Sequence, residues 1–129
     1  IPYYDFTSKF VTIKDDQPSF VDKPWGREEL IEYNDHYVVK KLFMKKGHRC
    51  SLQLHKKKIE TVTCLKGTLS IYLNKKKFIL KKDDTLTIKP FQIHRMFAEK
   101  SDCLYMESSS NHLTDIVRIE DDYSRVKSK

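Results

Sequence analysis

Short stretches rich in branched and aromatic residues alternate with Lys, Asp, Asn and Gly along the chain from residue 36 onward. Such stretches at roughly regular intervals are typical of an antiparallel β-sandwich or barrel. They lie at residues 36–44, 49–55, 60–65, 68–73, 77–80, 85–88, 94–99 and 103–108. In the fourth stretch, Leu69, Ile71 and Leu73 alternate with Ser70 and Tyr72, which indicates a strand with two different faces. The pattern predicts an all-β fold.

Helix signals are weak, because no segment shows a sustained 3.6-residue hydrophobic period with caps, apart from a short segment near the C-terminus. The N-terminal region contains Pro2, Pro18 and Pro24, and we expect it to form an arm that wraps the barrel. A length of 129 residues suits a single domain with one core. The predicted organisation is an N-terminal arm at 1–22, a barrel domain at 23–125 and a C-terminal tail at 126–129.

The composition is that of a soluble protein, since 39% of the residues are hydrophobic and no apolar run is long enough to span a bilayer. We therefore expect no membrane partner. The three cysteines, Cys50, Cys64 and Cys103, are odd in number, widely spaced and set among apolar neighbours. This pattern predicts reduced, buried thiols in a cytoplasmic protein.

A net charge of +7 with 25 Lys and Arg residues invites a nucleic-acid interpretation. The distribution of the charge argues against it, because no Arg-rich helix or aromatic stacking platform accompanies the lysines. The excess lies in short runs where strands would turn, at 40–41, 45–46, 56–58, 75–77 and 81–82. We expect a solubilising surface and no nucleic-acid partner, with some lysines able to steer a phosphorylated small molecule.

The segment 47–67, GHRCSLQLHKKKIETVTCLKG, holds a set of metal-capable side chains. Gln53 and His55 are two residues apart, so on a strand they project from the same face. If the strands on either side of the KKKI turn pair as a hairpin, Glu60 comes close to His55. His94, at the start of another predicted strand, is the best fourth candidate. These oxygen and imidazole donors suit zinc and, less selectively, iron, manganese or nickel.

The spacing of this segment resembles the first motif of the cupin superfamily, Gly-x5-His-x-His-x4-Glu-x6-Gly, with Gln53 in the first His position. The stretch DDTLTIKPFQIHRMFA resembles the second cupin motif and places His94 at the metal-ligand position. It departs from the family's Gly, Pro, Gly and Asn at Asp83, Lys89, Phe91 and Ala98. The resemblance implies a cupin-type double-stranded β-helix, also called a jelly-roll barrel, preceded by an N-terminal arm.

Within the cupins, the chain is most similar to the isomerase domain of type II phosphomannose (mannose-6-phosphate) isomerases. The matching pieces are KPWGREEL (23–30), VKKLFMKKGHRCSLQLH (39–55), the E-x6-GT element (60–68), IHR (93–95) and DIVRIEDDYSR (115–125). That family usually continues into a His-rich HHHRAEHW where this chain has KKKIETV. Such domains are often fused behind a mannose-1-phosphate guanylyltransferase, which implies a fused or associated nucleotidyltransferase module. Cupins commonly form homodimers, and we expect one here.

The resemblance implies a metal-dependent aldose–ketose isomerase, acting on mannose 6-phosphate and fructose 6-phosphate or a related sugar of polysaccharide and nucleotide-sugar synthesis. A divalent metal, expected to be zinc, would be held by Gln53, His55, Glu60 and His94. Arg95 and Lys40 are candidate catalytic and phosphate-binding residues, Glu107 is a further catalytic candidate, and Arg118 is a candidate for substrate binding. The general base stays open between Lys40, Glu107 and a hydroxide on the metal.

Several structural alternatives stand beside these assignments. Arg118 could pair with Asp121 or Asp122 instead of binding substrate, while Arg95 and Lys40 could be ordinary surface charges. At the level of function, the alternatives are a sugar-binding cupin without catalytic activity and a small iron-dependent cupin dioxygenase.

Overall fold

The computed structural model describes residues 20–125. The predicted tail at 126–129 and most of the predicted arm, residues 1–19, lie outside these described residues and stay predictions. Residues 20–22 of that arm belong to the first strand of the sheet, which extends to Lys23. Cys50, Cys64 and Cys103 are buried free thiols, as predicted. Across the described range, no helix has the length and apolar character needed to cross a membrane.

The described residues form eleven β-strands and no α-helix. The strands are β1 Phe20–Lys23, β2 Gly26–Tyr33, β3 Tyr37–Met44, β4 Leu52–Leu54, β5 Glu60–Lys66, β6 Leu69–Leu73, β7 Lys76–Leu80, β8 Thr85–Ile88, β9 His94–Phe97, β10 Cys103–Ser110 and β11 Val117–Glu120. The eight predicted stretches correspond to β3 through β10. The all-β prediction is therefore confirmed.

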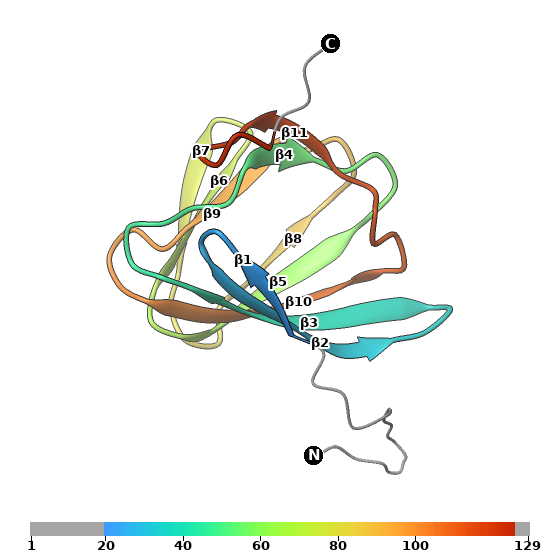
Figure 1. Cartoon of the computed structure of the whole chain (residues 1–129), viewed down its shortest axis with the longest axis horizontal. Helices are drawn as coiled ribbons and strands as arrows, with labels where there is room; N and C mark the ends of the chain where they lie inside the picture. Colours follow the sequence, from blue (N-terminus) through green and yellow to red (C-terminus); the bar gives the residue numbers. More distant parts are fainter. Residues whose placement is uncertain (1–19, 126–129) are drawn as a thin grey trace.

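The strands form two antiparallel sheets that face each other (Figure 1). One sheet has six strands in the order β1-β2-β3-β10-β5-β8, and the other has five in the order β11-β4-β9-β6-β7. Strands that follow one another in sequence often lie in different sheets, as β4 and β5 do. Burying one apolar face of each sheet against the other produces the two-layer arrangement.

The apolar core lies between the sheets. Leu69 and Ile71 of β6 are fully buried, as their alternation with polar residues predicted. They pack in one cluster with Val62 of β5 and Ile88 of β8 from the opposite sheet. Trp25, in the turn between β1 and β2, is also buried in this cluster, so the PWG turn is anchored to the core.

Two regions near the ends of the barrel form strands that the eight predicted stretches do not include. Residues 20–33 form the β1–β2 hairpin of the larger sheet, so residues 20–22 of the predicted arm pair with β2, and β11 is a strand near the C-terminus. The sequence pattern did not predict strand β2. Glu28 and Glu29 are charged residues at successive positions, so apolar and polar residues do not alternate regularly along this strand. The inward Glu28 faces a polar cavity instead of the core.

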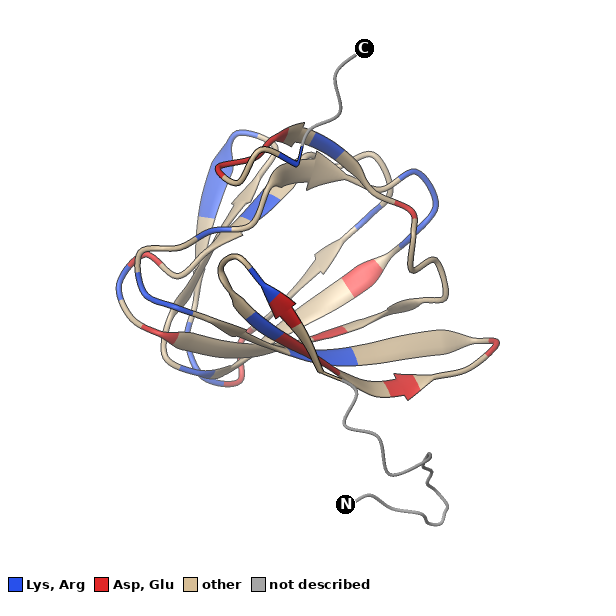
Figure 2. Ribbon diagram, in the orientation of Figure 1, with Lys and Arg blue, Asp and Glu red and all other residues tan. Residues whose placement is uncertain are grey.

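Figure 2 shows Lys and Arg spread over several loops and strands and interspersed with acidic residues. Lys45 and Lys46 follow β3, and Lys81 and Lys82 lie in the turn between β7 and β8. Lys40 departs from the predicted solubilising role, because it lies within β3 and lines a cavity.

Candidate metal centre

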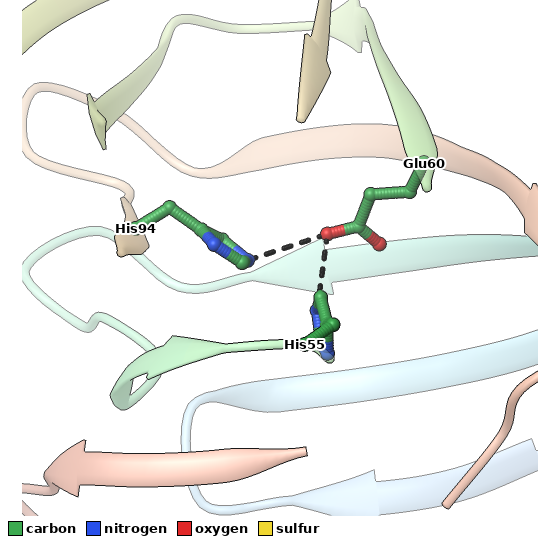
Figure 3. Close-up of side chains that lie close together, drawn as sticks. All are labelled: His55, Glu60 and His94. Carbon is green, nitrogen blue, oxygen red and sulfur yellow. Dashed lines mark ion pairs between the residues drawn. The ribbon is translucent and has the colours of Figure 1, made fainter. Parts of the chain in front are cut away.

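Three side chains meet between the two sheets (Figure 3). His55 directly follows β4 and His94 begins β9, both in the five-stranded sheet, whereas Glu60 begins β5 in the six-stranded sheet. One carboxylate oxygen of Glu60, Oε2, lies 3.4 Å from Nε2 of His55 and 3.3 Å from Nε2 of His94. The ligand atoms of the three residues all lie within 4.8 Å of one another. His55, Glu60 and His94 are called the buried triad below.

The predicted hairpin between residues 49–55 and 60–65 is wrong. Strand β4 pairs with β9 and β11, whereas β5 pairs with β10 and β8. The KKKI segment therefore crosses from one sheet to the other. His55 and Glu60 still meet, because the inward faces of the two sheets oppose each other at this point.

Hydrogen bonds to backbone carbonyls orient both imidazoles. Nδ1 of His55 lies 2.6 Å from the carbonyl oxygen of Asp115, and Nδ1 of His94 lies 2.9 Å from that of Gln92. A carbonyl oxygen can only accept, so each Nδ1 carries the donated proton. In a neutral imidazole, Nε2 is then left with a lone pair, which here points toward Glu60.

The buried triad is a set of electron-pair donors without a hydrogen-bond partner. Nε2 of His55, Nε2 of His94 and Oε2 of Glu60 are all buried and unpartnered. Burial opposes ionisation of Glu60, but the two imidazoles and the Lys58 ammonium stabilise the carboxylate and hold the pKa of Glu60 below its ordinary value. Three converging donors around one negative charge form a site that could hold a metal cation.

A divalent metal ion fits this arrangement. Two ligands held about 2.1 Å from a tetrahedral ion are about 3.4 Å apart. The two distances from Glu60 Oε2, 3.3 and 3.4 Å, match that separation. The donor set of two imidazoles and one carboxylate suits several divalent ions, so the geometry supports a metal without identifying it as zinc.

Gln53 lies beside the buried triad on the inward face of the smaller sheet. It is directly opposite His94 on β9 and directly opposite Arg118 on β11, so the three residues form one row across β11, β4 and β9. The hydroxyl of Ser51 donates a 2.7 Å hydrogen bond to Oε1 of Gln53. Gln53 stays a predicted fourth ligand.

The buried triad adjoins a cavity that is lined by many charged residues. His55 and Glu60 line it together with Gln53. Further charged residues come from both sheets, from the KKKI segment and from the segment after β11, namely Lys23, Glu28, Lys40, Lys58, Glu107, Arg118 and Arg125. A polar, concave space beside a candidate metal site has the character of a small-molecule site.

Lys40 and Glu107 face each other on β3 and β10, and both line the cavity. Nζ of Lys40 lies 2.8 Å from Oε2 of Glu28. Burial and the negative charge of Glu60 raise the pKa of Glu107 to about 8. A carboxyl group with its pKa raised in this way, in a cavity beside a candidate metal site, is a candidate for acid–base chemistry.

Arg95 does not line this cavity. Successive residues of a strand point to opposite faces, so Arg95 points outward where His94 points inward. Its Nε donates to the carbonyl oxygen of Cys50 at 2.8 Å, and a terminal nitrogen donates to that of Glu120 at 3.3 Å. Arg95 therefore does not line the cavity beside the buried triad, and its catalytic and phosphate-binding roles stay predictions.

Arg118 lines the cavity, and the alternative of pairing with Asp121 or Asp122 is wrong. Asp121 pairs with Arg125, and Asp122 pairs with Arg49. Among the described residues, Arg118 forms no ion pair, and its buried Nε has no hydrogen-bond partner. Its guanidinium is therefore available to an anionic ligand.

Sequence reasoning missed several residues around the cavity, chiefly Glu28, Lys58 and Asp115. The carboxylate of Asp115 accepts hydrogen bonds from the backbone N–H groups of Lys56, Lys57 and Lys58 at 2.7 to 3.0 Å. Together with the bond from His55 to its carbonyl, these contacts hold the KKKI segment in place. Nothing in the spacing of Asp115 could have revealed contacts to residues nearly sixty positions away.

Comparison with known proteins gives one family and one fold. The sequence matches the family described as "Mannose-6-phosphate isomerase C-terminal" over residues 13–121. A mannose-1-phosphate guanylyltransferase of Escherichia coli and the alginate biosynthesis protein AlgA of Pseudomonas aeruginosa are each 29% identical to it over 109 residues. These matches cover 80% and 81% of this chain but 23% of each relative. The chain thus spans about a quarter of the length of these curated relatives.

Solved structures with a similar fold include an RmlC-like cupin from Shewanella frigidimarina, with a TM-score of 0.68 and 12% identity over 79% of this chain and 91% of that one. A protein with a double-stranded β-helix domain from Klebsiella pneumoniae has a TM-score of 0.65 and 14% identity over 88% and 99% of the two chains. At such identities the likeness concerns the fold alone. It confirms the predicted cupin-type double-stranded β-helix.

Proposed function

Because this chain belongs to the mannose-6-phosphate isomerase C-terminal family of the cupin superfamily, we propose that it is a metal-dependent sugar-phosphate isomerase. The expected reaction interconverts mannose 6-phosphate and fructose 6-phosphate or a closely related aldose–ketose pair. The observation that carries the proposal is the buried triad of His55, Glu60 and His94, whose unpartnered donors border a cavity that also contains Glu107.

In this proposal, the buried triad and Gln53 hold a divalent ion, with zinc as the first candidate. Such an ion, when bound, would act as a Lewis acid toward the two neighbouring sugar oxygens that exchange hydroxyl and carbonyl character. The carbonyl contacts of His55 and His94 keep both Nε2 atoms turned toward Glu60, where they would be available to a bound ion.

Glu107 is the proposed carrier of the carbon-bound proton. Conversion of the aldose to the ketose removes a proton from C2 and adds one to C1, while the hydroxyl proton passes from O2 to O1. A carboxyl group with a pKa of about 8 can both accept and return a proton near neutral pH. Lys40, directly opposite on β3, stabilises the ionised form of Glu107.

The sugar phosphate is expected to bind through Arg118 and Lys58. Both line the cavity, and neither forms an ion pair within the described part of the chain. A guanidinium can bind phosphate with two parallel hydrogen bonds, and an ammonium adds a second positive charge.

The chain spans about a quarter of its guanylyltransferase relatives, and this supports a working association with a nucleotidyltransferase module, whether fused or separate. A homodimer and a cytoplasmic location stay predictions.

The test combines elemental analysis with an assay of mannose 6-phosphate isomerisation, on protein purified without a polyhistidine tag. We expect a near-stoichiometric divalent metal and activity, both lost in the Gln53→Ala/His55→Ala double variant. His36→Ala, which removes an exposed histidine, is the matched control. Metal without isomerisation of any phosphorylated aldose would assign the chain as a sugar-binding cupin. Wild-type protein that takes up no zinc, manganese, iron or nickel would overturn the proposal.

A further inference from the structure

Apart from Arg125, which pairs with Asp121, the cations of the cavity fall into two sets that come from different parts of the fold. Lys23 of β1 and Lys40 of β3 belong to the six-stranded sheet and share the carboxylate of Glu28 on β2. Lys58, in the segment that crosses between the sheets, and Arg118, on β11 of the five-stranded sheet, form no contact ion pair among the described residues.

Glu28 forms ion pairs with both lysines of the first set. Its Oε2 lies 2.8 Å from Nζ of Lys40, and its Oε1 lies 3.9 Å from Nζ of Lys23. The three side chains are only 15% to 26% exposed, so solvent screens their attraction weakly. A short bond between an ammonium and a carboxylate is among the stronger hydrogen bonds in proteins.

We propose that Glu28 is an internal anion that occupies Lys23 and Lys40 and so decides which ligands the cavity accepts. A ligand with one phosphate places it at Arg118 and Lys58, and its uncharged hydroxyl groups face Glu28. A second phosphate on the same ligand is excluded from Lys23 and Lys40. The placement of the first phosphate rests on the proposed function, whereas the blocking role of Glu28 does not.

The physical reason is a difference in local charge. Lys58 and Arg118 form no contact ion pair among the described residues, although Lys58 also attracts the carboxylates of Glu60 and Glu107. The carboxylate of Glu28, in contrast, directly contacts Lys40 and Lys23 and cancels one of their two charges. An anion that approached the lysines would have to displace Glu28 and leave this carboxylate unpaired in a partly buried site, which is costly.

The chain provides a matched control on the same strand. Glu29 follows Glu28 on β2 and therefore points to the opposite face of the sheet, where it lies opposite Lys41 of β3. Glu28→Gln and Glu29→Gln thus remove the same charge one residue apart, and only the first releases Lys40.

The experiment is a calorimetric titration of the protein with inorganic phosphate at constant ionic strength, in the presence of a chelator. We expect Glu28→Gln to bind phosphate at least about fivefold more tightly than wild type, or to gain a second site. Glu29→Gln should match wild type, and adding Lys40→Met to Glu28→Gln should abolish the gain. Equal phosphate binding by wild type and Glu28→Gln would overturn the inference.

Two further outcomes separate this inference from the proposed function. Wild-type protein that binds no phosphate, with binding created by Glu28→Gln, would support the role of Glu28 and count against the phosphate site at Arg118. If Glu28→Gln lowers the melting temperature, Glu28→Asp provides the second variant. Its shorter carboxylate keeps the charge, so wild-type phosphate affinity is expected, and a gain equal to that of Glu28→Gln would contradict the inference.

Discussion

His55 and Glu60 approach each other to 3.4 Å from opposite sheets, although only residues 56–59 separate them in the sequence. The crossing segment passes from one layer of the fold to the other, and the two side chains turn back into the space between the layers. His94 reaches the same point from β9. An ion bound by the buried triad would therefore join the two sheets.

The first prediction concerns stabilisation by metal. A ligand that binds only the folded state at 100 times its Kd raises the free energy of unfolding by about 2.7 kcal/mol. We expect zinc to raise the melting temperature of chelator-treated protein by several degrees. Glu60→Gln should abolish this shift, because it removes the charged donor of the triad. An undiminished shift in Glu60→Gln, measured by circular dichroism, would place the metal elsewhere.

The second prediction concerns the pH dependence that Glu107 imposes. Its pKa is raised to about 8 in the folded protein, against 4.5 for the ordinary group. Between these values the folded state holds a proton that the unfolded state has lost, so stability falls as the pH rises. Urea unfolding with chelator present should show wild type losing at least about 1 kcal/mol more than Glu107→Gln between pH 5 and 8. Parallel pH profiles for the two proteins would contradict this.

The third prediction separates Arg95 from Arg118. Arg95→Met leaves the carbonyl of Cys50 without its donor, and we expect a loss of about 1–3 kcal/mol in the free energy of unfolding. Metal content and activity per folded molecule should be retained. Arg118→Met should show the opposite behaviour, with nearly unchanged stability and weakened phosphate binding. An Arg95→Met protein that is stable but inactive would contradict this prediction and support a catalytic role of Arg95.

The fourth prediction concerns Asp115, whose hydrogen bonds hold the KKKI segment in place. Desolvation opposes the charge, but the backbone N–H groups of Lys56, Lys57 and Lys58 lower the pKa of Asp115 to about 2. A depressed folded pKa gives stability that is present above about pH 4 and lost as the pH falls toward 2. After allowance for solvent screening, Asp115→Ala should cost roughly 1 kcal/mol at pH 7.

The measurement for Asp115 is urea unfolding at pH 7 and pH 3. The cost of Asp115→Ala should shrink at the lower pH. The exposed Asp35 supplies a control, since Asp35→Ala removes a carboxylate that makes no ion pair among the described residues. Equal costs for the two variants at pH 7 would refute the anchoring role.

The fifth prediction compares two glycines with left-handed backbone conformations. Gly47 has a φ of +84° and Gly67 a φ of +80°. A Cβ at Gly67 would lie 2.1 Å from the carbonyl oxygen of Asp102, whereas nothing lies within 4 Å of one at Gly47. We expect Gly47→Ala to cost about 1 kcal/mol and Gly67→Ala clearly more, because backbone must move. Chemical denaturation of both variants checks the order, and equal costs would show that the close approach is easily relieved.

The strands β3 through β10 could be predicted from the sequence because all of them except β4 place side chains in the apolar core, which leaves an alternating pattern. Strands β2 and β11 could not be predicted in this way. Their inward residues Glu28 and Arg118 line a polar cavity, so alternation is lost. For the candidate site, residue type together with the resemblance to the two cupin motifs selected His55, Glu60 and His94, although the hairpin assumed between the first two is not formed.

By itself, the sequence determined which short segments become strands and which side chains can act as metal ligands, since alternation and donor chemistry are local properties. Only the tertiary structure decided how those strands pair and which face each charged side chain occupies. Pairing depends on contacts between distant residues, and it placed β4 and β5 in separate sheets. A shift of one residue along a strand reverses the face, which turned Arg95 away from the cavity while its neighbour His94 completed the triad.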